Sequence, residues 1–219
     1  MNIFDIIGPV MIGPSSSHTA GAVRIGKIAR KLLDEEAAEV VIKLHGSFAE
    51  TYRGHGTDKA LIGGLMGFST EDERIRNSME LAEKAGMRYR IESISLQDVH
   101  PNTAVIEAVG KTGKRVVVMG ASIGGGNIVI KKINDLDVEF NGQYCSLIIS
   151  HIDKPGVIAF VTGRMGNSQI NIAGMRDYRS SRGGEAIMIL ETDQEVDEKT
   201  VHDIKNNANI MNVIYMDKI

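Results

Sequence analysis

Three serines, a histidine and a threonine stand directly before a predicted helix, just after Gly13-Pro14. They are Ser15, Ser16, Ser17, His18 and Thr19. Free backbone N–H groups at a helix N-terminus, the positive end of its dipole and several hydroxyls together suit a carboxylate or a phosphate. The alternative is a redundant helix cap with His18 as a polar neighbour. Three serines exceed what one cap requires, which favours an anion site.

Two further loops carry histidines in settings that suit acid–base chemistry. His55 lies between glycines in the sequence GHGTD, and a neutral imidazole is a good proton acceptor or donor near pH 7. The alternative for GHGTD is a flexible turn, and in both cases we expect Asp58 to cap the next helix. His100 and Asn102 belong to an HPN sequence, a weak indication because such residues are common in turns. We expect His45, at a strand end, to be a packed or hydrogen-bonded structural histidine.

Other catalytic and metal-binding patterns are absent from the sequence. There is one cysteine, Cys145, so this chain by itself cannot supply the thiolates of an iron–sulfur cluster. The six histidines show no metal-ligand spacing. The glycine-rich GASIGGGNI lacks the Lys-Ser/Thr of a phosphate-binding P-loop, and no HExxH or GxSxG sequence occurs. We therefore expect no metal site on this chain.

Composition excludes several classes of protein. The net charge is −3, only 5% of residues are aromatic and there is no Trp, which argues against nucleic-acid binding. No apolar run approaches the roughly 20 residues that span a bilayer, so no membrane partner is expected. The N-terminus MNIFDIIGPVM has no basic segment followed by a long apolar one, which argues against a secretory signal. We expect a cytoplasmic protein.

Hydrophobic periodicity predicts the elements that position these residues. The helix after the serines has an apolar stripe formed by Val23, Ile25, Ile28, Ala29 and Leu32. A β-branched run at 38–46 predicts a buried strand. Thr70 and Glu73 form a capping box for a helix whose apolar face is Ile75, Met79 and Ala82, with Gly86 at its end. Further strands are predicted at 89–96, 103–110, 115–122 and 127–133.

The tight-turn sequence Asn141-Gly142 marks the predicted boundary between two domains, 1–142 and 143–219. In the second domain, strands at 145–152, 169–178, 185–193 and 212–219 alternate with helices at 153–166 and 196–207. Pro155 is expected near the first turn of one helix and Asp197 at the cap of the other. This order predicts a ferredoxin-like βαββαβ unit, and the whole chain is α/β in the broad sense, or α+β.

Three segments in this order resemble the β chain of bacterial iron–sulfur L-serine dehydratases: FDIIGPVMIGPSSSHTAGAVRIG, GSFAETYRGHGTDKA and DVHPNT. The resemblance implies an N-terminal α/β domain also found as an allosteric anion-binding domain in some phosphoglycerate dehydrogenases. It implies conversion of L-serine to pyruvate and ammonia together with a separate α chain. The cysteines of that α chain would hold a [4Fe–4S] cluster, whose open iron would act as a Lewis acid on the substrate hydroxyl.

The resemblance also implies roles for single residues. His55 would be the catalytic acid or base facing the partner's cluster, and His100 and Asn102 would line the same pocket. Ser15, Ser16, Ser17, His18 and Thr19 would bind or position the substrate carboxylate. Because the related dehydrogenase domain is regulatory, both a catalytic and a regulatory role stay open for PSSSHT.

The segment SHIDKPGVIAFVTGRMGNSQINIAGM resembles an ACT domain, a βαββαβ amino-acid sensor. This resemblance implies an amino-acid site between the first strand–helix loop of one copy and the second strand of another. The residues at those positions are His151, Asp153, Pro155, Gly156, Asn171 and Ile172. The alternative is a unit that only pairs chains, and either case implies a homodimer through the ACT domains.

The leading interpretation is an enzyme subunit that is inactive without its α chain. The alternative is a stand-alone amino-acid-responsive binding module that regulates another enzyme. GHGTD and HPN favour the enzyme, because a pure sensor has no need of them. A pyridoxal-phosphate dehydratase lacks support, since no lysine stands in a convincing cofactor context.

Overall fold

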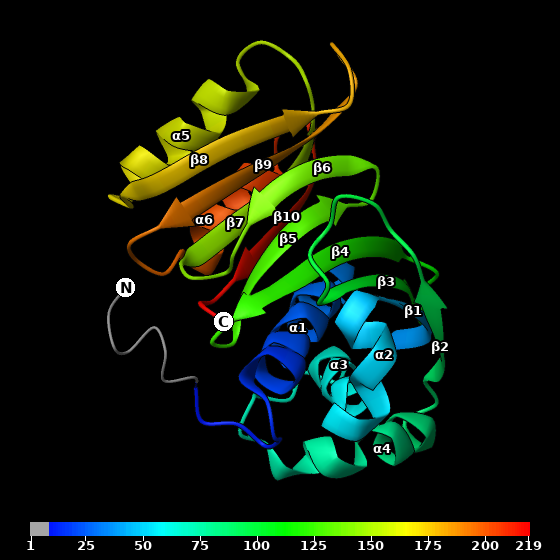
Figure 1. The fold of residues 1–219 in the computed structure, drawn as a ribbon. Helices are drawn as coiled ribbons and strands as arrows, with labels where there is room; N and C mark the ends of the chain where they lie inside the picture. The colour runs from blue at the N-terminus through cyan, green and yellow to red at the C-terminus, as the bar shows by residue number, and fades with distance from the viewer. Residues whose placement is uncertain (1–8) are drawn as a thin grey trace. The chain divides into compact units, whose positions relative to one another are not determined.

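The computed structural model describes residues 9–219, and the chain divides into two compact units between Asn134 and Asp135 (Figure 1). Helices and two sheets confirm the predicted α+β fold class. The domain boundary after Gly142 stays a prediction. Residues 4–8 of the first dehydratase-like segment lie outside the described residues.

The first unit opens with a π-helical segment that runs directly into a regular helix. The π-helical segment is η2 (Ser16–Gly21), and α1 (Ala22–Leu33) follows it. The predicted apolar stripe is confirmed, since all its members are buried: Val23, Ile25, Ile28, Ala29 and Leu32. The unit also contains α2 (Gly46–His55), α3 (Thr57–Leu65), the short 3₁₀ helix η3 (Glu73–Asn77) and α4 (Ser78–Lys84).

The strands of the first unit lie in the order β2-β1-β3-β4-β5, and helices α1 to α4 gather on one side of them (Figure 1). Their bounds are β1 (Ala37–His45), β2 (Arg88–Ile94), β3 (Thr103–Gly110), β4 (Arg115–Gly124) and β5 (Asn127–Ile133). β1 and β2 are parallel and the other pairs are antiparallel. The register pairs Leu44 with Ala104 and Thr103 with Ala121. The end of β1, the start of β3 and the end of β4 therefore share one edge of the sheet.

The predicted capping box at Thr70 is wrong. The Thr70 hydroxyl donates to the Val10 carbonyl at 2.9 Å, and the Thr70 carbonyl accepts the Ile12 N–H at 2.8 Å. Because Thr70 is bonded to the N-terminal segment, Asp72 caps the helix instead and accepts the Arg74 N–H at 2.9 Å. The first turn is 3₁₀, so the expected single helix is divided into η3 and α4.

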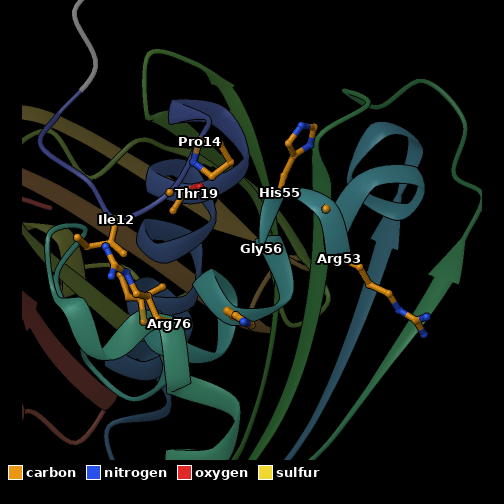
Figure 2. Close-up of a pocket in the computed structure, with 11 residues that line it drawn as sticks. Ile12, Pro14, Thr19, Arg53, His55, Gly56 and Arg76 are labelled. Carbon is orange, nitrogen blue, oxygen red and sulfur yellow. The ribbon is translucent and has the colours of Figure 1, made fainter.

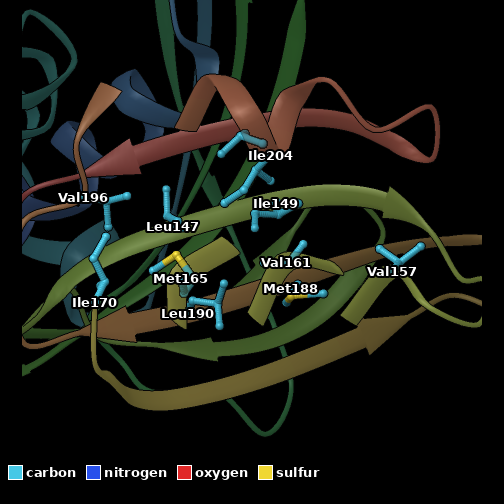
Figure 3. Packing of buried hydrophobic residues seen from close by; sticks show 11 residues of the cluster. Leu147, Ile149, Val157, Val161, Met165, Ile170, Met188, Leu190, Val196 and Ile204 are labelled. Carbon is cyan, nitrogen blue, oxygen red and sulfur yellow. The ribbon is translucent and has the colours of Figure 1, made fainter. Parts of the chain in front are cut away.

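The second unit has the predicted βαββαβ order. After β6 (Leu136–Phe140) come β7 (Cys145–Ile152), α5 (Val157–Asn167), β8 (Ile172–Arg179), β9 (Glu185–Thr192), α6 (Glu198–Lys205) and β10 (Ile210–Met216). The strand order β10-β7-β9-β8 is antiparallel between neighbours, as in ferredoxin-like folds. Alternate residues of β7 and β9 point to the two helices and form the core in Figure 3, including Leu147, Ile149, Met188 and Leu190.

Helix boundaries in this unit differ in detail from the prediction. Asp197 caps α6 as expected and accepts the Thr200 N–H at 2.8 Å. Pro155 lies near the first turn of α5 as expected, but the helix starts at Val157 instead of 153, after Gly156 with φ +91° at the cap position. Helix α6 ends at Lys205, two residues before the predicted end of the helix at 207.

Candidate active site

His18 and His55 lie against each other at the edge of the sheet where β1 ends. Their ring centroids are 4.7 Å apart and the ring planes are inclined by 54°. His18 belongs to the PSSSHT segment and His55 to the last turn of α2, so the fold brings together two segments that the sequence separates. The two imidazole rings therefore lie side by side near the N-terminal end of η2.

The His18 ring is held by hydroxyls from two elements. Its Nδ1 lies 3.3 Å from Ser15 Oγ, and its Nε2 lies 3.1 Å from Ser47 Oγ at the start of α2. Phe48 meets the ring edge-on, with centroids 5.2 Å apart. Burial and the neighbouring His55 lower the pKa of His18 below its ordinary value of 6.5, against a smaller opposing effect of a hydrogen bond that the ring donates to the Ser47 backbone. His18 is therefore predominantly neutral at pH 7.

A pocket of about 330 Å³ lies next to the two histidines. His55 and Thr19 line this pocket, whereas His18 does not. Figure 2 shows Arg76 beside Ile12, and His55 beyond Pro14 and Thr19. The residues that line it are Ile12, Gly13, Pro14, Thr19, Arg53, Gly54, His55, Gly56, Lys59, Ile75 and Arg76. Thr70 is hydrogen-bonded to Val10 and Ile12, and these bonds hold the segment before Gly13 next to η3. The pocket is therefore lined by residues of both segments.

Two buried polar atoms of the pocket residues have no hydrogen-bond partner: Thr19 Oγ1 and His55 Nδ1. Thr19 is 1% exposed, and a Cβ at Gly13 would come within 2.2 Å of its hydroxyl, so the tight wall there requires glycine. Buried polar atoms in folded proteins are nearly always paired, and leaving one unpaired costs about 1–3 kcal/mol. Both atoms belong to residues that line the pocket, so they are candidates to pair with a polar group bound there.

The charge of the pocket suits an anion. Lys59 and Arg76 are exposed cations on its wall, and none of the described lining residues is acidic. Arg53 also lines the pocket, but Figure 2 shows its guanidinium directed away, and its Nε donates to the Tyr52 hydroxyl at 3.1 Å. A small molecule with a carboxylate and further polar groups fits these features.

The HPN loop lies at the same sheet edge but does not line the pocket. Its Pro101 carbonyl accepts the Phe48 N–H at 3.4 Å, and a Cβ at Gly46 would lie 2.7 Å from the same oxygen. His100 is exposed, with Nδ1 accepting the Asn102 N–H at 3.1 Å, and the Asn102 carbonyl accepts the Ser122 N–H. The loop therefore packs against the start of α2, and a direct role for His100 and Asn102 stays a prediction.

Two smaller predictions about single residues have opposite outcomes. The structure confirms that His45 is hydrogen-bonded, because its Nδ1 accepts the Leu96 N–H at 3.2 Å. The prediction that Asp58 caps α3 is wrong, because Gly56, with φ +70°, occupies the cap position. Asp58 lies inside the first turn, buried, and accepts the Lys59 N–H at 2.8 Å.

The residues predicted for an amino-acid site in the second unit fall into two groups. Asp153, Pro155 and Gly156 form the loop after β7, where Asp153 accepts the Gly183 N–H and binds Arg179, both at 3.1 Å. Asn171 and Ile172 lie at the start of β8, and the registers with β9 place them at the other end of the sheet. A site containing both groups would need a second copy of the chain.

His151 from the same prediction is buried in β7. Its Nδ1 lies 3.1 Å from the Ile152 carbonyl and its Nε2 lies 3.0 Å from Asp177 Oδ1. Both ring nitrogens are therefore engaged within the chain.

The described residues contain no cluster of three or more His, Cys, Asp or Glu that could hold a metal ion. Cys145 is a free thiol at the first position of β7. Within residues 9–219, no helix combines the length and the apolar character that crossing a bilayer requires.

A family model described as the serine dehydratase beta chain matches residues 2–133. The chain belongs to this family. The probable L-serine dehydratase beta chain of Bacillus subtilis is 43% identical over 212 residues, covering 97% of this chain and 96% of that protein. The L-serine dehydratase beta chain of Peptoniphilus asaccharolyticus is 39% identical over 89% of this chain and 88% of its own length.

This serine dehydratase beta chain family member is also similar, at lower identity, to part of another enzyme. D-3-phosphoglycerate dehydrogenase of Bacillus subtilis is 28% identical over 199 residues, which are 90% of this chain and 37% of that protein. The beta chain thus corresponds to part of a longer polypeptide there.

Sequence reasoning missed several residues of this serine dehydratase beta chain site. Ser47 directly precedes Phe48 in the sequence without any motif of its own, and only its contact with His18 distinguishes it. Ile12 and Arg76 come from segments far apart in the sequence that Thr70 and η3 bring together. No spacing rule could have indicated them.

Proposed function

We propose that this chain is the β subunit of an L-serine ammonia-lyase, which converts L-serine to pyruvate and ammonia. The observation that carries the proposal is a pocket lined by the cations Lys59 and Arg76 and by Thr19 and His55, each of which has a buried polar atom without a partner. L-Serine offers a carboxylate to the cations and further polar groups to the unpaired atoms. The names of the Bacillus subtilis and Peptoniphilus asaccharolyticus beta chains support this substrate.

In the proposed reaction, L-serine loses its α-proton and its hydroxyl group as water, giving aminoacrylate. Aminoacrylate becomes the imine, which takes up water and releases pyruvate and ammonia. His55 would take the α-proton or protonate the departing hydroxyl, since imidazole does either near neutral pH. Thr19 would orient the substrate together with Lys59 and Arg76, which line the same pocket. Ser15, Ser16 and Ser17 are not among the lining residues, so direct substrate contact by these serines stays a prediction.

The [4Fe–4S] cluster does not fit on this chain, because the described residues offer no ligand set and Cys145 stands alone in the second unit. We therefore place it on an α chain that pairs with this one. Bound there, the cluster would supply the Lewis acid for the substrate hydroxyl. His100 and Asn102, in the HPN loop, are proposed to face the same partner.

The second unit is proposed to be an ACT domain. Its strand order and the two separated residue groups agree with an amino-acid site shared between two copies, which implies a homodimer. L-Serine is the simplest candidate ligand, since the enzyme would then respond to its own substrate.

The test is anaerobic purification of the full chain from its source with any chain that accompanies it, followed by measurement of pyruvate from L-serine. We expect activity only when a cysteine-rich chain co-purifies, and none from the chain made alone in a foreign host. His55→Gln should lower kcat by about 10²–10⁴. The matched control is His202→Gln, an exposed histidine of α6. Unchanged turnover in His55→Gln would refute its role.

A preparation with no partner and no pyruvate formation, but with bound L-serine, would favour the stand-alone binding module instead.

A further inference from the structure

Both ring nitrogens of His18 are occupied by hydroxyls of this chain. Ser15 Oγ accepts the His18 backbone N–H at 3.3 Å, so its own proton is available to the Nδ1 lone pair. Nε2 then carries the ring proton and donates it to Ser47 Oγ at 3.1 Å. This pattern assigns one neutral tautomer to His18 and leaves no ring nitrogen for a substrate carboxylate.

Helix α2 encloses the same ring from two sides. Phe48 and His55 are seven residues apart, which places them two turns apart on one face of the helix. Phe48 is fully buried and meets the His18 ring at 5.2 Å, while His55 contacts it at 4.7 Å. The His18 ring is therefore held in place by its surroundings, and it lies in contact with the tilted ring of His55.

We propose that His18 is a positioning residue, anchored by Ser15 and Ser47, and that its ring sets the orientation in which His55 faces the pocket. The proposal rests on the proposed function, in which His55 moves the substrate proton. It gives His18 a role through His55 instead of the direct substrate contact expected from the sequence. It also adds Ser47 to the residues on which turnover depends.

The charge of His18 supports this role. Burial is the larger cause that lowers the pKa of His18, and the neighbouring His55 is the smaller one. Among the described residues, His55 is the titratable group whose charge acts on the His18 ring. A neutral His18 allows His55 to take a proton without a second positive charge 4.7 Å away. A charged His18 would oppose that step.

The first test replaces Ser47 in the complete complex of both chains. Ser47→Ala removes the hydrogen bond between Ser47 and His18. It should lower kcat about tenfold, the equivalent of one lost hydrogen bond, and change KM by less than about twofold. Ser47→Thr, which keeps the hydroxyl, should restore kcat. Glu50→Ala, at an exposed position of the same helix, is the control. A raised KM with unchanged kcat would assign His18 to substrate binding, and no change in either would overturn the proposal.

The second test does not require turnover. Nitrogen NMR of the full chain with ¹⁵N-labelled histidine should show His18 as the neutral Nε2–H tautomer at pH 7. Ser47→Ala should shift the ring resonances of both His18 and His55, whereas Glu50→Ala should shift neither. Unmoved His55 resonances in Ser47→Ala would refute the positioning role. A complex that forms no pyruvate while these shifts are present would count against the proposed function alone.

Discussion

At the scale of single residues, His18 connects the hydrogen bonding of the site to its charge. Its two hydroxyl partners come from Ser15, before η2, and from Ser47, at the start of α2. Desolvation disfavours the imidazolium, and a neighbouring imidazole disfavours it further. The residue is therefore specialised for staying neutral, while His55 keeps an unpaired nitrogen.

This charge state predicts how stability depends on pH. Because the pKa of His18 is lowered in the folded chain, the unfolded chain binds more protons below pH 6.5. The free energy of unfolding should therefore decrease as the pH falls from 6.5 toward the folded pKa and be free of this contribution above that range. Urea denaturation at pH 5 and pH 8 checks this, with His18→Gln as the comparison. Equal losses in both proteins would contradict it, since all other titrating groups are shared.

At the scale of elements, α1 and α3 approach each other through glycines. A Cβ at Gly64 would lie 2.1 Å from the Val23 carbonyl oxygen and 2.9 Å from the Cα of Gly26. A Cβ at Gly26 would lie 2.4 Å from the Leu61 carbonyl oxygen. Backbone meets backbone here, so no side-chain rotation could relieve a clash. The close crossing holds the helix that follows His55 against the one that follows PSSSHT.

Gly64→Ala should therefore destabilise the first unit by about 1–3 kcal/mol through overpacking. The matched control is Gly54→Ala in α2, where an added methyl group would meet no atom within 4 Å. That change should be neutral or stabilise by up to about 1 kcal/mol, because alanine is the better helix former. Thermal unfolding should give a lower melting temperature for Gly64→Ala than for Gly54→Ala. Similar melting temperatures would contradict the prediction and show that α1 and α3 can move apart with little loss of stability.

At the scale of the whole molecule, the two units carry different structural features. The first carries the pocket, and the second carries a βαββαβ sheet whose predicted ligand residues lie at opposite ends within one copy. If two copies complete the second site, binding and pairing are linked, and a ligand that prefers the paired state must promote it.

Calorimetry of the full chain with L-serine should therefore detect a binding event that depends on residues of the second unit. Asn171→Ala should weaken this binding about tenfold, since it removes a side chain that could contact the ligand. Glu195→Ala, exposed in the same unit, should leave it unchanged. Sedimentation in the presence of L-serine should show more dimer. Absence of binding together with a stable dimer would assign the unit to pairing only.

The sequence by itself determined the elements, because hydrophobic periodicity and turn residues act locally. It identified β3, β5 and β7 to the residue, the buried stripe of α1 and the βαββαβ order. It also indicated PSSSHT as a candidate anion site and GHGTD as a candidate for acid–base chemistry. It misplaced the cap at Thr70 because that hydroxyl bonds to Val10, sixty residues away.

Only the tertiary structure decided which of these segments meet. The contact of His18 with Ser47 and His55, and the wall formed by Ile12 and Arg76, depend on how α2 and η3 pack on the sheet. Such contacts join residues tens of positions apart, and no local pattern encodes them. The chemistry of each side chain could therefore be inferred from the sequence, but its partner could not.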